Sequence, residues 1–217
     1  MAVTGHSSPP RVPRGRHAPP LEVRIGVQRR RLLEAAAAVF ADRGYAEGSA
    51  EAISREAGMS KATFYEHFAN KEECILVLFD EAATEVMRAM ASAGEETGPF
   101  DTFEERVAAG ARAFLETLAA YPESAQTLLV EVIGAGPRAA ARRDAILQAF
   151  ADAMQRDFAH AAPRYGAGTF ASTDDAFGII GACVELVSRQ LRTGKPEDML
   201  DLQPVIVRLT LGALQPA

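Results

Sequence analysis

Apolar residues recur at spacings of three and four along nearly the whole chain, which places them on one face of a helix. Alanine, the residue with the highest helix propensity, occurs 42 times among the 217 residues. Runs of β-branched residues with a period of two, which would indicate strands, are missing. The chain is therefore predicted to be an all-α protein with about nine helices.

Glycine, proline and short polar residues divide the chain into these helices. Gly44 and Gly58 are placed to end helices, and Ser49, Ser60 and Asn70 are placed to cap the helices that follow. Expected helices cover about 23–43, 50–57, 61–68, 71–93, 100–120, 122–134, 137 onward, 173–193 and 201 onward. A loop rich in glycine and alanine is expected over 163–171, and Asp201 is expected to cap the last helix.

Residues 1–20 differ in composition from the rest of the chain. They hold five of the twelve prolines, together with Arg11, Arg14 and Arg16, and contain almost nothing to bury. Such a segment cannot offset the entropy that it would lose on ordering. We therefore expect residues 1–20 to form a disordered Arg/Pro-rich arm.

The net charge of −6 is distributed unevenly. Residues 1–71 contain 11 Lys and Arg against 7 Asp and Glu, whereas residues 72–217 contain 12 against 22. A basic end on an acidic body indicates two functions in one chain. The basic end can approach phosphate while the acidic body is repelled, which favours an oriented nucleic-acid contact.

Several classes of protein are disfavoured. No apolar run approaches the ~20 residues of a membrane helix, and no secretory signal is visible, so a cytoplasmic protein is expected. The two cysteines and four scattered histidines lack metal-ligand spacing, and no cofactor-binding motif is present. We therefore predict no metal, no cofactor and no catalytic residues.

Two short helices joined by Ala57-Gly58-Met59-Ser60 match the plan of a helix-turn-helix. Ile53, Phe64 and Phe68 can pack together against the helix predicted over 23–43. Three helices with a glycine turn are a moderate signal by themselves, because many small helical domains share them.

The sequence AISREAGMSKATFYEHFANKEECILVLFDEA, residues 52–82, resembles the DNA-binding region of the tetracycline-repressor (TetR) family of bacterial transcription regulators. The resemblance rests on Ala57-Gly58-Met59-Ser60, Ala62-Thr63, Tyr65 and Lys71-Glu72, and covers about residues 29–82. It implies a three-helix DNA-binding domain over 21–69 and a helical ligand-binding and dimerisation domain over 70–217. A homodimer that binds a palindromic double-stranded DNA operator is expected.

In such a motif the helix predicted over 61–68 enters the major groove by its N-terminal end. Lys61 is its only long basic side chain, so we expect Lys61 to contact a guanine edge. Tyr65 is expected from the resemblance to bind a phosphate. The full set of predicted DNA-binding residues is Ser49, Ser60, Lys61, Ala62, Thr63, Tyr65, His67 and Lys71.

Other interpretations of these residues stay open. Lys61 can be a solvated lysine, and Lys71 can serve only the carboxylates beside it. No Arg, Asn or Gln lies on the third helix, so specificity is expected to come partly from DNA shape and from an arm that enters the minor groove. The arginines proposed for that role are Arg11, Arg14, Arg16 and Arg24, which can equally form a solubilising tail.

The resemblance also implies a ligand cavity inside the acidic body. Candidate lining residues are Phe103, Phe114, Tyr121, Glu131, Phe150, Met154 and Phe177. Most of these are expected to be simple core residues, with no more than half of them lining a cavity. Glu131 lies in the apolar run 128–133, where it can bind a polar ligand group or pair with an arginine.

The last two predicted helices each carry two apolar faces. One face can pack on the body and the other can pair with a second subunit in a two-fold interface. The alternative is a monomer in which one larger core covers both faces.

The sequence thus predicts a ligand-responsive transcription regulator, with a repressor released by a small, largely apolar effector as the preferred form. Two alternatives stay open. A small all-α enzyme would need a convergent acid–base cluster, for which Asp174-Asp175 is the nearest candidate. A non-specific DNA binder is disfavoured by the acidic body, because non-specific affinity is mostly electrostatic.

Overall fold

The computed structural model describes residues 20–96 and 100–216, and these residues are helical apart from loops and one isolated bridge between Thr169 and Gln215. The nine α-helices in this part are α1 (Leu21–Glu47), α2 (Ala50–Glu56), α3 (Lys61–His67), α4 (Lys71–Glu96), α5 (Phe103–Ala120), α6 (Pro122–Leu129), α7 (Pro137–Ala161), α8 (Thr173–Thr193) and α9 (Gln203–Gly212). Three 3-10 helices are η1 (Glu131–Gly134), η2 (Ala162–Tyr165) and η3 (Met199–Leu202). The all-α prediction is confirmed, and the predicted arm lies outside the described residues up to position 19.

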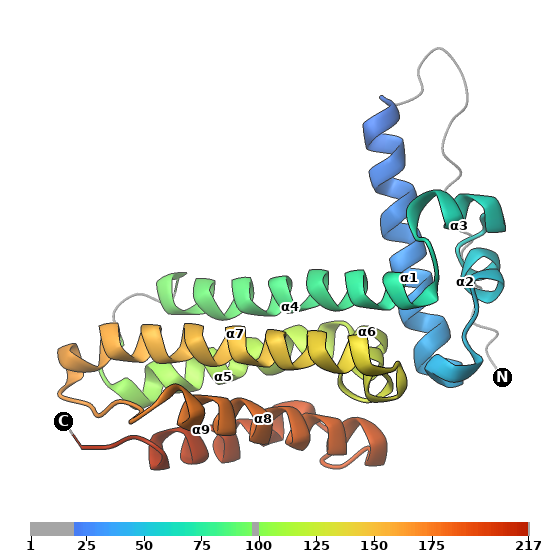
Figure 1. Ribbon diagram of the computed structural model, residues 1–217. Helices are drawn as coiled ribbons and strands as arrows, with labels where there is room; N and C mark the ends of the chain where they lie inside the picture. Colours follow the sequence, from blue (N-terminus) through green and yellow to red (C-terminus); the bar gives the residue numbers. More distant parts are fainter. Residues whose placement is uncertain (1–19, 97–99, 217) are drawn as a thin grey trace, which may run out of the picture.

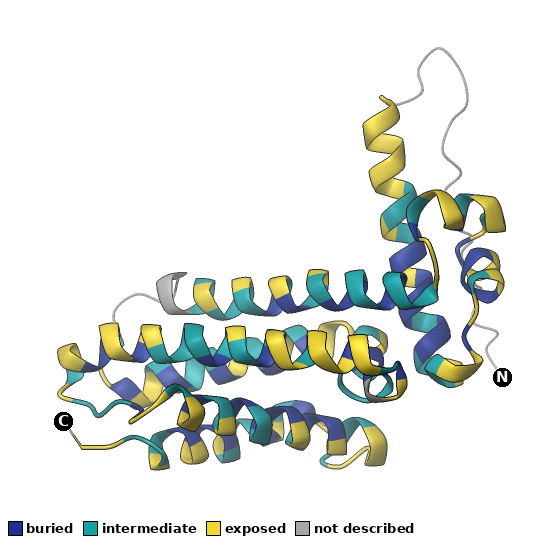
Figure 2. Cartoon of the chain, viewed as in Figure 1, coloured by how far each residue is buried: buried dark blue, intermediate teal, exposed yellow. Residues whose placement is uncertain are grey.

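Helices α1 to α3 form a compact group at one end of an elongated bundle (Figure 1). Helix α4 starts beside this group and runs along the bundle, where it packs mainly on α5, while α7 packs mainly on α8. Helix α1 crosses the end of the bundle and contacts α6 and η1. The first turns of α1 project beyond α2 and α3 and are exposed (Figure 2).

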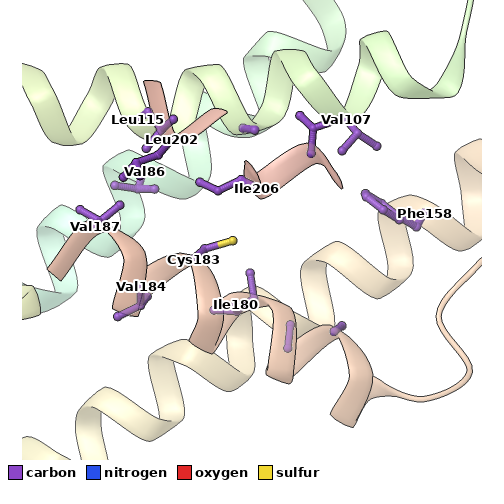
Figure 3. Close-up of a cluster of buried hydrophobic side chains, with 14 of the residues drawn as sticks. Val86, Val107, Leu115, Phe158, Ile180, Cys183, Val184, Val187, Leu202 and Ile206 are labelled. Atoms are coloured by element: carbon purple, nitrogen blue, oxygen red, sulfur yellow. The ribbon is translucent and has the colours of Figure 1, made fainter. Parts of the chain in front are cut away.

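The buried side chains form two clusters. The first joins α1, α2 and α3 to the first half of α4 and is continued by Leu128, Val132 and Ala139 from the body. Its largest members, Phe40, Phe64 and Phe68, are buried. The second cluster lies between α4, α5, α7, α8 and α9, and its side chains come from several of these helices (Figure 3).

Helix boundaries near the recognition motif follow local capping chemistry. The hydroxyls of Ser49 and Ser60 accept hydrogen bonds from the backbone N–H groups of Ala52 and Thr63, at 3.2 and 3.1 Å. Asn70 Oδ1 accepts from the N–H of Glu73 at 2.9 Å and caps α4. These three predicted caps are confirmed.

The prediction for the end of the chain needs correction. Asp201 lies inside η3 and does not cap a helix. The cap of η3 is Asp198, whose carboxylate accepts a hydrogen bond from the N–H of Leu200 at 2.9 Å. Helix α9 starts at Gln203, with Pro204 in its first turn as expected. The predicted helix over 122–134 is divided, because α6 ends at Leu129 and a 3-10 turn follows.

Candidate functional site

The outer face of α3 is the exposed surface of the helix-turn-helix. Lys61, Ala62 and Tyr65 are exposed on it, and the Tyr65 side chain is 51% accessible. Phe64 and Phe68 hold the opposite face in the core with at most 1% exposed. Because the buried face fixes the rotation of this short helix, the three exposed side chains are available to a groove of DNA.

The turn before α3 is fastened from α1. Gly58 has a positive φ of 64°, which favours glycine at this position. Arg31 Nη2 donates a hydrogen bond to the carbonyl oxygen of Ala57 at 2.8 Å. Arg29 lies with its guanidinium 5.1 Å from the centre of the Phe68 ring and pairs with Glu81 at 3.7 Å. Both arginines therefore support the motif from α1.

Lys71 has a structural role that the sequence did not indicate. Its Nζ donates hydrogen bonds to the carbonyl oxygens of Tyr45, Ala46 and Gly48, at 2.8, 3.0 and 2.9 Å. An ammonium group has three donors, so this arrangement uses all of them. As a predicted DNA-binding residue, Lys71 was expected to contact the phosphate backbone, and this geometry does not fit such a contact; instead, the side chain ties the start of α4 to the end of α1.

His67 also departs from its predicted role. Its Nε2 is buried and has no hydrogen-bond partner among the described residues. Burial, together with the charge of Arg29, lowers the pKa of His67 below its ordinary value. The imidazole is therefore neutral near pH 7 and lacks the charge that would favour a phosphate.

A cavity of about 300 Å³ lies inside the body. Its wall is mostly apolar and comes from all six helices α4 to α9. Residues that line it include Phe79, Val86, Met87, Met90, Phe114, Phe150, Met154, Cys183 and Ile206. Such a volume lies at the lower end of the range of small-molecule sites.

Three of the seven predicted ligand residues, Phe114, Phe150 and Met154, line this cavity. Among the described residues that form its wall, Phe103 and Phe177 do not appear. Phe103 packs instead against Phe158 and Tyr165, with ring centres 5.2 and 5.7 Å away.

Tyr121 and Glu131 were wrongly predicted to face the ligand. Tyr121 is 59% exposed at the start of α6, away from the cavity wall. Glu131 lies at the contact between η1 and α1, where its Oε2 accepts a hydrogen bond from the N–H of Tyr45 at 3.3 Å. No arginine pairs with Glu131 among the described residues. The apolar residues around Glu131 in the sequence did not indicate that its hydrogen-bond partner, the N–H of Tyr45, comes from α1.

Charged residues of the cavity wall escaped the sequence analysis. Arg106 and Asp157 line it and form an ion pair of 2.5 Å between α5 and α7, and Arg143 lines it nearer the start of α7. Helical spacing could have identified two of them, because Arg143 precedes Leu147 by four residues and Asp157 follows Met154 by three, which places both on the apolar face of α7. A stripe defined only by apolar residues omits such positions.

The outward sides of α8 and α9 expose apolar surface. Leu209 is 39% exposed, and Ile179 and Leu186 are half-buried, whereas Ile180 and Val207 are buried in the core. Ile179 and Leu186 also pack against the second buried cluster, so a separate second apolar face on each helix stays a prediction. Its pairing with another subunit stays a prediction.

The described residues show neither a metal centre nor a membrane-spanning helix. Across 20–96 and 100–216, no three His, Cys, Asp or Glu side chains gather to hold a metal ion. No helix in the same part of the chain combines the length and apolar character needed to cross a membrane.

Residues 32–78 match the family model of bacterial regulatory proteins of the tetR family. The fatty acid degradation regulator FadR of Bacillus halodurans is structurally similar, with a TM-score of 0.73 and 22% identity over 88% of this chain and 97% of that chain. FadR of Bacillus subtilis, in complex with stearoyl-CoA, has a TM-score of 0.69 and 19% identity over 86% of this chain and 99% of that chain. AibR, in complex with isovaleryl coenzyme A and operator DNA, has a TM-score of 0.63 and 19% identity over 86% of this chain and 100% of that chain. No curated protein matches significantly.

Proposed function

Because residues 32–78 identify this chain as a TetR-family transcriptional regulator, a DNA-binding protein and not an enzyme, we propose that it is a ligand-responsive repressor. In this proposal a homodimer binds a palindromic operator, and a small, largely apolar effector releases it. The observation that carries the proposal is the path of α4. This helix begins at Lys71 beside the recognition motif, and its residues from Phe79 to Ala91 line the cavity.

The α3 face supports a sequence-dependent contact with duplex DNA. Lys61 is exposed on this face and is proposed to contact a base edge or a phosphate, and the exposed Tyr65 lies one turn further on. The backbone N–H groups at Ser60 favour a phosphate. Ser49, Ala62 and Thr63 complete the proposed contact surface.

Dimerisation through α8 and α9 is the second part of the proposal. Both helices keep apolar side chains on their outward sides, and a two-fold pair of such helices would bury them. A dimer also presents two α3 helices to the two halves of a palindrome, about one DNA turn apart.

The apolar wall of the cavity supports an effector with a large apolar part. Structural neighbours have been solved with stearoyl-CoA and with isovaleryl coenzyme A, which is consistent with such an effector. Occupation of the cavity would displace α4 and change the separation of the two recognition helices. The effector then shifts the population toward a conformation with low operator affinity.

Selection of bound duplexes from a random pool tests the proposal. We expect a palindromic consensus, a dimer-sized footprint, and release of the DNA by an apolar compound that binds the cavity. Equal affinity for unrelated duplexes with a steep salt dependence would instead indicate a non-specific DNA binder.

A further inference from the structure

The wall of the cavity follows α7 and includes an arginine towards each end of that helix's contribution. Its α7 wall extends from Arg143 to Phe158, a separation of roughly 22 Å at the helical rise of 1.5 Å per residue. Arg143 lies near the end of α7 that faces α1, whereas Arg106 and Asp157 lie towards the far end. Between them the wall is apolar, with Met87, Phe114 and Phe150 among its residues.

The charge at the far end is already balanced. Arg106 Nη2 donates to Asp157 Oδ1, and the Arg106 side chain is only 20% exposed. A carboxylate entering there would meet the negative charge of Asp157 as well as the positive charge of Arg106. The buried Nε of Arg106 has no acceptor among the described residues, so a neutral acceptor group suits this end of the cavity better than an anion does.

The charge of Arg143 is not balanced in this way. Among the described residues, its ion pair is with Asp144, at 3.9 Å, and the side chain of Asp144 is 72% exposed. Adjacent residues on a helix do not face each other, so this contact is weak and strongly solvated. The Arg143 side chain itself is only 27% exposed and lines an apolar cavity. A partly desolvated guanidinium is a strong site for an anionic group.

The two neighbouring arginines of α7 are occupied, in contrast. Arg138 pairs with Glu72 at 2.8 Å, and Arg142 pairs with Asp80 through hydrogen bonds of 2.6 and 2.5 Å. Both pairs connect α7 to α4. Of Arg138, Arg142 and Arg143, only Arg143 has no ion-pair partner on α4 among the described residues, so it is left to bind a ligand in the cavity.

We propose that the effector is an anionic amphiphile, whose charged group binds Arg143 and whose apolar tail extends along α7 towards Phe158. This assignment rests on the proposed function, because it names the ligand class of the same cavity. Arg143 lies on the same segment of α7 as Arg138 and Arg142, whose ion pairs connect α7 to α4, so an anion at Arg143 binds where α7 is held against α4. It therefore acts on the contacts that hold α4, the helix that leads to the recognition motif.

The shared chemistry of the ligand is a negative group on an unbranched apolar tail, which a free fatty acid or an acyl-CoA both provide. Binding of decanoate and hexadecanoate to the full chain without DNA is measured by calorimetry. The matched neutral probes are decan-1-ol and hexadecan-1-ol. Decanoyl-CoA and hexadecanoyl-CoA form a third arm, which distinguishes a free carboxylate from an anionic carrier.

We expect at least one anionic series to bind about tenfold or more tightly than the alcohol with the same tail. Arg143→Gln removes this preference and leaves alcohol binding nearly unchanged, whereas Arg143→Lys retains part of it. Arg112→Gln is the control, because Arg112 is exposed and pairs with Glu116 on the surface of α5. Circular dichroism establishes that each variant is folded.

Equal binding of anion and alcohol, binding of neither, or a preference that survives Arg143→Gln would overturn the assignment. A preference lost in Arg106→Gln but kept in Arg143→Gln would place the charged group at the far end instead. Operator release is scored separately. If the alcohol releases the operator as effectively as the carboxylate with the same tail does, the anion site is contradicted and the proposed function is retained. An anion that binds through Arg143 but never releases the operator contradicts the proposed function alone.

Discussion

The carboxylate of Glu131 accepts a hydrogen bond from the backbone N–H of Tyr45, with 3.3 Å between Oε2 and the nitrogen. Tyr45 follows Gly44, whose φ of 77° interrupts the helical geometry of α1. A Cβ on Gly44 would lie 3.1 Å from Glu131 Oε2, so glycine permits this close approach as well as the backbone conformation. The interruption in α1 is therefore held by a residue that follows α6, whose Leu128 and Leu129 line the cavity.

Glu131→Ala is expected to lower the free energy of unfolding by about 1–2 kcal/mol, because it leaves the Tyr45 N–H without its acceptor. Glu131→Gln retains an acceptor and should lose less. Urea denaturation measures both, with Glu123→Ala as the control at an exposed position of α6. Wild-type stability of Glu131→Ala would show that the contact contributes nothing to the fold.

Lys71 and Lys61 should respond in opposite ways to substitution. Lys71→Met keeps the apolar stem but removes three hydrogen bonds to carbonyl oxygens, so the free energy of unfolding should fall by about 1–3 kcal/mol. Lys61→Ala should leave stability unchanged and weaken operator binding by about 1–3 kcal/mol. Denaturation and operator titration at several salt concentrations measure the two effects. If Lys71→Met lowers the salt dependence of operator affinity by about one released counterion, Lys71 does contact a phosphate, as the sequence predicted.

Tyr65→Phe removes only an exposed hydroxyl. The ring keeps its edge contact with Phe64, whose centre lies 5.5 Å away, so thermal stability should not change. Operator affinity should fall about fivefold to tenfold if the hydroxyl donates to a phosphate. Fluorescence anisotropy with the selected operator measures the loss, and Tyr121→Phe is the control at another exposed tyrosine. Unchanged affinity would remove Tyr65 from the contact surface.

Gly110 of α5 lines the cavity, and a Cβ built on it meets no atom within 4 Å. Gly110→Ala is expected to raise the free energy of unfolding by about 0.5–1 kcal/mol, because alanine favours helix more than glycine does. Gly110→Leu should also remain folded but fill part of the cavity. Calorimetry should then show weaker binding of both decanoate and decan-1-ol to the leucine variant than to the alanine variant. Equal binding would mean that the ligand does not occupy this region.

Burial raises the pKa of the Cys74 and Cys183 thiols from 9.0 to about 12. The folded state thus holds these protons to a higher pH than the unfolded state does. Their contribution to stability is complete below about pH 9 and is lost as the pH rises towards 12, by at most about 1.4 kcal/mol per pH unit for each thiol. Urea denaturation at about pH 8 and about pH 10 should show a larger loss for the wild type than for Cys74→Ala/Cys183→Ala. Identical losses would contradict the shift.

The helix caps and the exposed face of α3 were largely predictable because their signals are local. Ser49, Ser60 and Asn70 cap helices through groups three residues away, and Phe64 and Phe68 leave Lys61 and Tyr65 on the opposite face. The cavity was predictable only in part. Phe114, Phe150 and Met154 lie on helical stripes that face it, but the same reasoning included Phe103 and Tyr121, because periodicity identifies an apolar face without identifying what it contacts.

Local chemistry along the chain is sufficient to specify an all-α protein, the turn at Gly58 and the exposed side of α3, because these depend on neighbours within about one helical turn. Packing alone decides the roles of Lys71 and Glu131, whose partners lie 23 to 26 and 86 residues away in the sequence. It also decides that Asp157 pairs with Arg106 between α5 and α7, whereas Arg143 has only its exposed neighbour Asp144 as an ion-pair partner among the described residues. A charged residue has the same helical spacing whether it is paired or free, so only the neighbours brought by other helices distinguish the two.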